Sequence, residues 1–238
     1  LGLANMQAAS ALRTGLDIVP ASDHSILVTL GHEISPEVHA RVRRFCHLLT
    51  GNLHDAILNV HPAYASVLVT FEPRESDLEE IGALLDLLLR KVDEIEDPPA
   101  RTVQIPVCYG GEHGPDLAEV ARMCGLPPEE VIERHVAGEY SVYFLGFAPG
   151  FAYLGNIDES IAAPRREVPR SEVPPGSVGI NGRQTGIYPL ATPGGWRLIG
   201  RTPLKIFDLQ RERPSVLAFG DRVKFYAITP KEFESRCR

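Results

Sequence analysis

The fold is decided by two neighbouring stretches, YSVYFLGFAPGFAYLG at 140–155 and PRREVPRSEVPPGSVGINGRQTGIYPLATPGGW at 164–196. Eleven of the chain's 21 glycines lie between Gly138 and Gly200, interleaved with prolines and aromatic residues. Loops that are rich in glycine and proline are usually poor in Phe, Tyr and Trp. Here the aromatic residues indicate packed loops, and the glycines indicate tight turns or a close approach of the backbone to another group. We therefore interpret this region as a ligand-binding or partner-binding surface rather than a linker.

The same region predicts a β-rich domain over residues 101–232. Short strand candidates, separated by Gly and Pro turns, lie at 140–145, 186–190, 196–199, 204–207, 216–218 and 222–228. Val103–Val107 predicts a further strand before them. Many short strands with turn residues between them are typical of a β-barrel or a β-sandwich.

Two short helices are expected at Leu117–Met123 and Glu129–Val136, and their spacing imitates a helix-turn-helix. The second helix carries Glu129, Glu130 and Glu133, which is the wrong charge for the major groove of DNA. The acidic balance of the chain points the same way. Its net charge is −7, and residues 1–100 carry 15 acidic and 7 basic side chains. We therefore expect no nucleic-acid partner.

Residues 21–98 predict a small α+β domain. Strands are expected at 26–30, 56–60 and 66–71, and one helix begins at Ser35-Pro36 and ends at Gly51. A capping box from Ser76 to Glu79 predicts the start of a second helix. Two amphipathic helices on a small antiparallel sheet would bury both apolar stripes. The run EIEDPPAR at 94–101 is the expected boundary, and residues 1–20 are expected to form a loose tail.

Composition places the protein among ordinary globular chains, with 44% hydrophobic and 23% charged residues over 238 positions. The four cysteines show no C-x-x-C pairing, so neither a zinc site nor a disulfide framework is indicated. No apolar run approaches the roughly 20 residues that a membrane span requires. We expect a cytoplasmic protein without a membrane partner or a bound metal.

Several familiar catalytic motifs are absent. The sequence contains no G-x-x-x-x-G-K-[ST] phosphate loop, no G-x-S-x-G nucleophile elbow and no H-E-x-x-H zinc motif. The remaining candidates lie near the glycine-rich stretch. His135 ends a predicted helix, where the helix dipole favours an imidazolium that donates a proton or holds an anion; a surface capping role is the alternative. Arg165, Arg166 and Arg170 fit bidentate binding of a carboxylate or phosphate, or are solvated loop charges.

Further polar groups stand beside glycine backbone in Gln184-Thr185-Gly186-Ile187-Tyr188, where they can orient a small ligand or satisfy the turn itself. Trp196, the one tryptophan of the sequence, is expected in the core or in a pocket wall.

The motifs HVAGEYSVYFLGFAPGFAYLG, PRR at 164–166, VPPGSVGINGRQTGIYPLATPGGWRLIGRT and FGDRV at 219–223 resemble the B-subunit family of 5-oxoprolinase, which also includes the kinase inhibitor KipI and proteins labelled allophanate hydrolase subunit 1. The resemblance covers roughly residues 20–230. It implies an α+β chain in which a small N-terminal α/β-sandwich domain precedes a cyclophilin-like β-barrel domain. Because function depends on the site, the barrel alone does not imply prolyl isomerase activity.

The resemblance also implies a heteromeric complex with a KipA-like C-subunit and with an A-subunit. That complex converts 5-oxoproline and ATP to glutamate, ADP and phosphate, with ATP and Mg²⁺ as co-substrate and no tightly bound cofactor. Two alternatives remain: a KipI-like inhibitor of a histidine kinase, and a subunit that processes allophanate or a urea-related amide. The motifs are the same for all three.

This chemistry suggests roles for individual residues. The expected catalytic residues are His135, Arg166, Gln184 and Tyr188. The expected substrate-binding residues are Arg165, Gly182, Thr185, Gly186, Pro193, Gly194, Gly195 and Trp196. The expected partner interface is an exposed apolar patch that contains Phe144, Phe147, Phe151 and Tyr153. The four catalytic candidates are expected to meet in one cleft.

Overall fold

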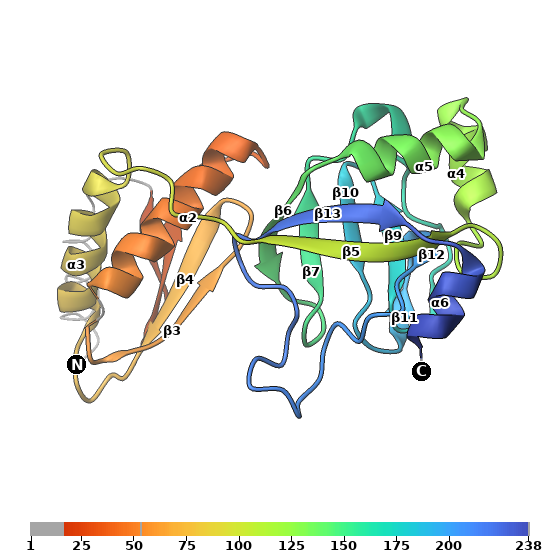
Figure 1. Cartoon of the computed structure of the whole chain (residues 1–238). Coiled ribbons are helices and arrows are strands. Elements are labelled where there is room, and N and C mark those ends of the chain that lie inside the picture. Colours follow the sequence, from red (N-terminus) through yellow and green to blue (C-terminus); the bar gives the residue numbers. More distant parts are fainter. Residues whose placement is uncertain (1–16, 53, 238) are drawn as a thin grey trace. The chain divides into compact units, whose positions relative to one another are not determined.

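The computed structural model describes residues 17–52 and 54–237, and it divides into two compact units between Pro99 and Ala100. Figure 1 traces both units along the chain. Together they confirm the predicted fold class, an α+β chain with a closed barrel in its second unit. None of the described helices is long and apolar enough to cross a membrane.

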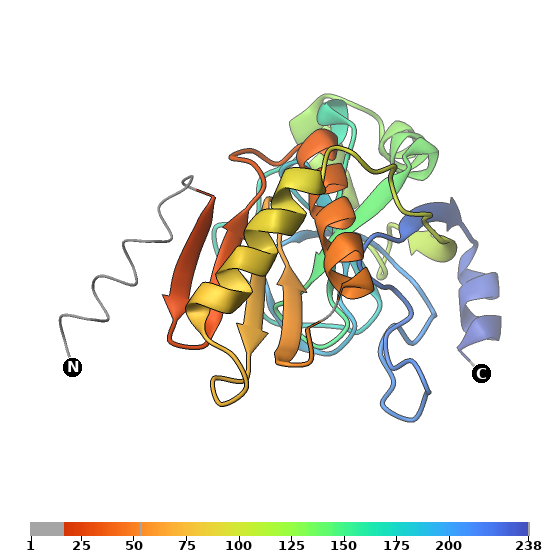
Figure 2. The same cartoon turned by 90° about the vertical axis from the view of Figure 1, so that its left-hand side faces the viewer.

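The first unit is a four-stranded antiparallel sheet in the order β1-β2-β4-β3, with two helices on one of its faces (Figure 2). Its elements are β1 (Ile18–Ser22), β2 (Ser25–Thr29), α2 (Pro36–Gly51), β3 (Ile57–Pro62), β4 (Ser66–Phe71) and α3 (Leu78–Lys91). Alternate residues of the sheet face the helices and are buried, among them Ile26, Val28, Val67 and Val69. The period-2 pattern of the strands and the helical stripes therefore meet in one core.

Helix α2 begins as predicted, because Ser35 is its N-cap and Pro36 its first residue. It continues through Gly51 to a cap at Asn52. The sequence missed β1, which begins at Ile18 inside the segment expected as a tail; residues 1–16 of that segment lie outside the described residues. The strand is easily overlooked because only Ile18 is buried and the other four residues are exposed.

The start of α3 lies one residue later than the expected capping box. Asp77 is the N-cap, and its Oδ1 accepts hydrogen bonds from the backbone N–H groups of Glu79 and Glu80 at 3.0 and 2.9 Å. Ser76 instead donates its hydroxyl hydrogen bond to the Glu80 side chain at 2.8 Å. A carboxylate is the stronger acceptor here because it also interacts favourably with the positive end of the helix dipole.

The second unit is a closed barrel in the order β10-β7-β6-β13-β5-β12-β9. Strand β13 runs parallel to β5, and the other neighbours with described registers are antiparallel. Its elements are β5 (Thr102–Tyr109), α4 (Leu117–Cys124), α5 (Pro128–Ala137), β6 (Tyr140–Leu145), β7 (Ala152–Gly155), the 3₁₀ turn η1 (Glu159–Ile161), β8 (Arg170–Val173), β9 (Ser177–Asn181), β10 (Gln184–Ile187), β11 (Thr192–Gly194), β12 (Arg197–Arg201), β13 (Arg222–Ala227) and α6 (Pro230–Arg236).

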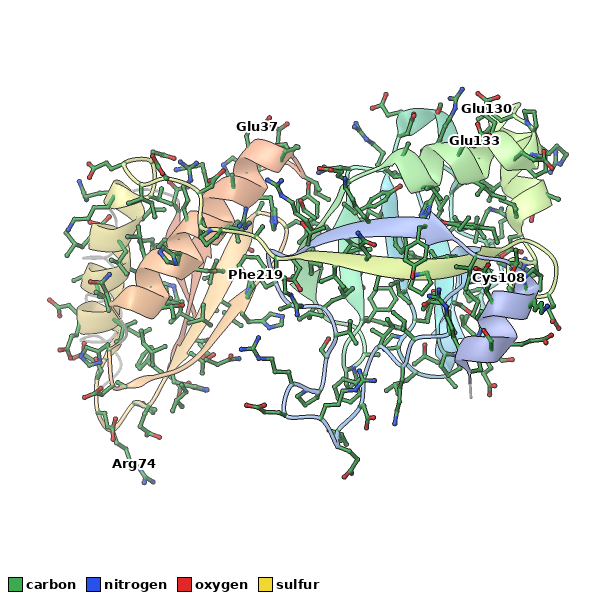
Figure 3. All side chains as sticks on the ribbon, viewed as in Figure 1. Glu37, Arg74, Cys108, Glu130, Glu133 and Phe219 are labelled. Atoms are coloured by element: carbon green, nitrogen blue, oxygen red, sulfur yellow. The ribbon has the colours of Figure 1, made fainter. Side chains whose placement is uncertain are left out.

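The two helices expected before the barrel are present as α4 and α5. On α5 the side chains of Glu130 and Glu133 stand on the outer side of the helix (Figure 3), and Glu130 is paired with Arg134. This outer face therefore carries the glutamates noted in the sequence together with one arginine.

Two expected strands, at 204–207 and 216–218, are wrong. The only pairing in this part of the described chain is an isolated bridge between Phe207 and Ser215. Ile206 and Leu217 are nevertheless buried, so their apolar spacing reflects a loop that packs on the barrel core. Pro203 and Pro214, which precede the two segments, have no N–H to donate to a ladder.

The sequence also missed β7, β8, β9 and β11, because these strands are short and contain or border glycine and proline. Gly186 in β10 shows why glycine is needed within a strand here. A Cβ at Gly186 would lie 3.0 Å from the Trp196 ring and 3.1 Å from the Ala152 carbonyl oxygen. Glycine therefore lets an indole lie directly against the barrel wall.

We predict that Asp77→Ala lowers the free energy of unfolding of the N-terminal unit by about 1 kcal/mol, because two helix N–H groups lose their acceptor. Ser76→Ala, the matched control, should cost less than about half of that. Urea denaturation followed by far-UV circular dichroism measures both. If Ser76→Ala lowered the free energy of unfolding more than Asp77→Ala, Ser76 would be the N-cap, as expected from the sequence.

Candidate functional site

One concave site in the barrel unit combines aromatic walls with a cation and exposed backbone. It is a cavity of about 300 Å³, which we call the aromatic pocket. Its lining residues are Phe147, Phe151, Tyr153, Arg165, Pro169, Tyr188, Pro193, Gly194, Gly195 and Trp196. They come from the β6–β7 loop, from β7, from the segment before β8, and from the chain between β10 and β12.

Phe151 is the centre of the aromatic walls. Its ring makes edge-to-face contacts with Tyr153, Tyr188 and Trp196, at centroid distances of 4.9, 5.2 and 5.5 Å. Phe151 is buried and so is Tyr188, so these rings form part of the core of the unit. Such aromatic pairs add to stability beyond the burial of their area. The pocket walls are therefore preformed rather than assembled by a ligand.

Phe147 differs from the other aromatic residues because its side chain is 63% exposed. Its backbone φ is +70°, and the Ala148 N–H donates a hydrogen bond to the Gly146 carbonyl oxygen at 2.8 Å. This combination is that of the classic γ-turn, which is rare and strained. A bulky residue in this conformation costs roughly 1–2 kcal/mol relative to a relaxed backbone. Strain of this kind is concentrated at functional sites.

These observations divide the expected partner interface. Phe147 is exposed at the pocket and fits a contact surface, whereas Phe151 belongs to the core. Phe144 stacks on Tyr153 at 4.4 Å, and both are partly buried. The expectation of one large exposed patch is therefore wrong for Phe151, because its ring is needed to hold the pocket together.

Arg165 and Arg166 precede β8 and Arg170 is its first residue, and the three side chains face two different sites. Arg165 lines the pocket and lies over Gly195, where an added Cβ would be 3.3 Å from both Nε and Nη2. Arg166 and Arg170 instead donate to Oδ1 of Asp116, at 3.2 and 2.7 Å. Adjacent residues of an extended segment face opposite sides, which explains why Arg165 and Arg166 part.

The segment that carries Arg165 is held on both sides of this residue. Arg197 donates from Nε to the Pro164 carbonyl oxygen at 2.8 Å, and the Arg166 N–H donates to the Gly195 carbonyl oxygen at 2.7 Å. Arg197 is itself buried and paired with Glu119 at 2.6 Å. The Arg165 side chain is thus presented to the pocket from a fixed backbone.

Asp116 was not among the residues expected from the sequence. Burial raises the pKa of this carboxyl, but the hydrogen bond from Arg170, the Leu198 N–H and the charges of Arg170 and Arg166 outweigh burial, so its pKa lies below the ordinary value. The carboxylate is therefore ionised at neutral pH. The available signal was an aspartate at a helix start in a glycine-rich loop, which sequence alone assigns to capping; the structure shows no capping bond from its side chain.

The Tyr188 hydroxyl lies where the pocket meets this arginine cluster. Burial raises the pKa of Tyr188, while the Trp196 N–H and the charges of Arg165 and Arg170 act in the opposite direction without reversing the shift. The phenol therefore stays protonated at neutral pH and can donate a hydrogen bond to a ligand.

His135 is not in the pocket, and it is fully buried in the barrel unit. Thr185 donates its hydroxyl hydrogen to the Gly179 carbonyl oxygen at 3.0 Å, so it accepts from His135 Nε2, also at 3.0 Å. The other ring nitrogen, Nδ1, then accepts from the Tyr109 hydroxyl at 2.8 Å. Burial lowers the pKa of His135 to about 3, so the ring is neutral.

The expected imidazolium at the helix end is therefore wrong, since desolvation outweighs the helix dipole. The four catalytic candidates do not meet in one cleft. Tyr188 lines the pocket, Arg166 is tied to Asp116, and Gln184 begins β10 opposite Asn181. Their functional roles stay predictions.

The expected substrate-binding residues also divide. Arg165, Pro193, Gly194, Gly195 and Trp196 line the pocket, but Gly182, Thr185 and Gly186 are not among its lining residues. Thr185 is buried and accepts a hydrogen bond from His135. Gly182 lies in the β9–β10 turn, and its N–H donates to the Ala163 carbonyl oxygen. Within the described residues, no group of three or more His, Cys, Asp or Glu side chains is arranged to hold a metal.

We predict that the neutral His135 makes stability depend on pH. The unfolded chain takes up a proton on this residue below its ordinary pKa of 6.5, and the folded chain does so only near 3. The stabilisation is thus complete above 6.5 and is lost as pH falls, by up to about 1.4 kcal/mol per pH unit. His135→Gln should reduce the slope of unfolding free energy between pH 6 and 4; an unchanged slope would contradict a neutral buried ring.

The sequence of this chain is similar to those of several known proteins. Residues 16–217 match the family described as the carboxyltransferase domain, subdomain C and D. The 5-oxoprolinase B-subunit of Bacillus subtilis (strain 168) is 42% identical over 223 residues, which cover 90% of this chain and 93% of that protein. The 5-oxoprolinase B-subunit of Escherichia coli O157:H7 is 57% identical over 132 residues, 56% of this chain and 61% of that protein.

Solved structures agree on the fold. A conserved uncharacterized protein from Pyrococcus horikoshii is 46% identical, with a TM-score of 0.55, and the match covers 91% of this chain and 99% of that one. The urea carboxylase of Kluyveromyces lactis has a TM-score of 0.67 at 23% identity, over 92% of this chain and 22% of that protein. The latter likeness concerns the fold alone.

Proposed function

The chain belongs to the B-subunit family of 5-oxoprolinase, and we propose that it is the B-subunit of an ATP-dependent 5-oxoprolinase that works with a KipA-like C-subunit and an A-subunit. The observation that carries this proposal is the 42% identity to a 5-oxoprolinase B-subunit over nearly the full length of both chains. The reaction is the conversion of 5-oxoproline and ATP to glutamate, ADP and phosphate in the cytoplasm.

The aromatic pocket suits the substrate of this reaction. 5-Oxoproline is a small, flat ring that carries one carboxylate and one amide. Arg165 can pair with the carboxylate, the Tyr188 hydroxyl can donate to an oxygen, and Trp196 with Phe147 can cover the ring. A cavity of about 300 Å³ is at the lower end of ligand pockets and fits such a small molecule.

The chemistry requires positioning more than a protein nucleophile. A lactam carbonyl is a poor electrophile, and transfer of the γ-phosphoryl group of ATP to its oxygen makes it reactive. Water then attacks the carbonyl carbon and the C–N bond breaks, which leaves a γ-glutamyl phosphate with a free amine. A second water hydrolyses this acyl phosphate to glutamate and phosphate. A bound substrate that is held by its carboxylate presents the lactam oxygen in a fixed direction, which lowers the entropic part of the barrier.

ATP and Mg²⁺ enter the proposal as co-substrate rather than as residents of this chain. The sequence lacks a phosphate loop, and the arginines beside the pocket are partly neutralised by Asp116. We therefore assign the larger share of the nucleotide site to the partner subunits. The inhibitor of a histidine kinase and the urea-related subunit share the same motifs, and no contact in the described residues favours either over the 5-oxoprolinase.

Phe147 is the proposed contact with the C-subunit. The exposed Phe147 ring contributes little to core packing, and its turn is strained. We therefore assign the ring a role in contact with the partner subunit. Its neighbours at the pocket are the proposed substrate residues. Under this proposal, partner and substrate therefore bind next to one another.

Replacement of Arg165 should weaken substrate binding. In the complex of this chain with its A- and C-subunits, Arg165→Gln should raise KM for 5-oxoproline about tenfold or more with a smaller change in kcat, because a charged hydrogen bond to the bound carboxylate is lost. 5-Oxoproline-dependent ATP hydrolysis measures this. Arg183→Gln, which removes a positive charge from an exposed pair with Glu159, is the matched control.

The isolated chain should show no such ATP hydrolysis. Robust turnover by the pure chain would refute a function shared with the C-subunit. An unchanged KM in the Arg165 variant would refute the pocket as the carboxylate site, while the family membership would stand.

Phe147→Asp should abolish co-purification with the C-subunit and leave the barrel folded, because the ring contributes little to the core. Phe151→Asp should unfold the barrel unit, because it buries a charge among packed rings. Thermal unfolding of the two variants and pull-down with a tagged C-subunit separate these effects. A Phe147→Asp variant that still binds the C-subunit at wild-type strength would place the interface elsewhere.

A further inference from the structure

The charge beside the aromatic pocket is set by one buried carboxylate. Asp116 has a side chain that is 4% exposed, and it pairs with Arg166 at 3.2 Å and Arg170 at 2.7 Å. Within residues 17–52 and 54–237 no ion pair is formed by the Arg165 guanidinium, although it lies on the pocket wall. The three arginines therefore have two different tasks.

The position of Asp116 is fixed from two sides. Its N–H donates to the Leu198 carbonyl oxygen at 2.9 Å, and its Oδ2 accepts from the Leu198 N–H at 2.7 Å. Oδ1 is left for the two arginines. Leu198 lies in β12, two residues after the pocket residue Trp196. The Asp116 carboxylate is therefore hydrogen-bonded to the strand that directly follows the pocket wall.

The charge balance follows directly. Arg165 lines the pocket, and the charge of Arg170 acts on the pocket residue Tyr188. Asp116 pairs with Arg170 and Arg166, so the cluster of three guanidinium groups and one carboxylate has a surplus of two positive charges, and without Asp116 the surplus would be three. Each additional positive charge favours a doubly charged ligand more than a singly charged one. The substrate assigned above has one carboxylate, and opening of its ring creates a second carboxylate together with an ammonium group, so the net charge of the ligand does not change.

We propose that Asp116 is a positioning residue that determines specificity, because it neutralises part of the arginine cluster and so tunes the pocket to ligands with one carboxylate. This inference rests on the proposed function of the pocket. Its consequence is that a dicarboxylate without an ammonium group is held less tightly than it would be beside three unpaired arginines.

The sequence supplies a direct reporter for this idea. Trp196 is the chain's single tryptophan and it lines the pocket, so its fluorescence responds to occupancy without any need for turnover. 5-Oxoproline is the singly charged probe. Glutarate is the doubly charged probe of the same chain length. Both are titrated into the full chain, alone and with the C-subunit.

The expected result is a change in the ratio of the two dissociation constants. Asp116→Asn should shift this ratio toward glutarate by about fivefold, the size of one partly screened charge interaction. Arg166→Gln should shift it in the opposite direction, because Asp116 then faces Arg170 alone. Arg183→Gln loses the same charge from a pair with Glu159 that does not involve Asp116, and it should leave the ratio unchanged.

The outcomes separate the two proposals. If Asp116→Asn and Arg166→Gln weaken both probes by the same factor, Asp116 only supports the loop and the inference is overturned. If Asp116→Asn does not fold, the opposite shift in Arg166→Gln decides the matter by itself. If the wild-type chain binds 5-oxoproline neither alone nor with the C-subunit, the proposed function of the pocket fails first, and the inference fails with it.

Discussion

A carboxylate that is removed from water must find its hydrogen bonds within the protein, and in the barrel unit this requirement organises the site. Asp116 is buried and ionised, and it draws Arg166, Arg170 and the Leu198 N–H toward itself. Loss of one partner of such a buried pair typically costs about 3–5 kcal/mol. Because its partners come from the segment before β8, from the first residue of β8 and from β12, the same requirement sets where Arg165 and Trp196 lie at the pocket.

The sequence predicted much of the fold, because strong periodic patterns survive into the structure. Helices α2, α4 and α5 and strands β4, β6 and β13 lie where the pattern placed them. The failures have physical causes. The short strand β9 contains Gly179, which packs against Trp196, and sequence rules assign such a glycine to a turn. At 204–207 and 216–218 apolar spacing came from a buried loop.

The site was harder to predict than the fold, because function depends on which side of a strand a residue faces. Arg165 and Arg166 are chemically identical neighbours, yet one faces the pocket and the other faces Asp116. His135 lies at a helix end, where a charged ring was expected, but tertiary burial makes it neutral. Residues expected separately for substrate and partner proved to line one cavity, which couples the two proposed roles physically.

The γ-turn at Phe147 lowers the stability of the fold in order to keep an aromatic ring exposed. Glycine at this position would adopt a φ of +70° without penalty, so a selection for thermal resistance alone would replace the aromatic residue. A selection for activity would keep it, if the exposed ring contacts what we propose. Heat-tolerant variants obtained at this turn would then be impaired, and position 147 would mark where stability and activity trade against each other.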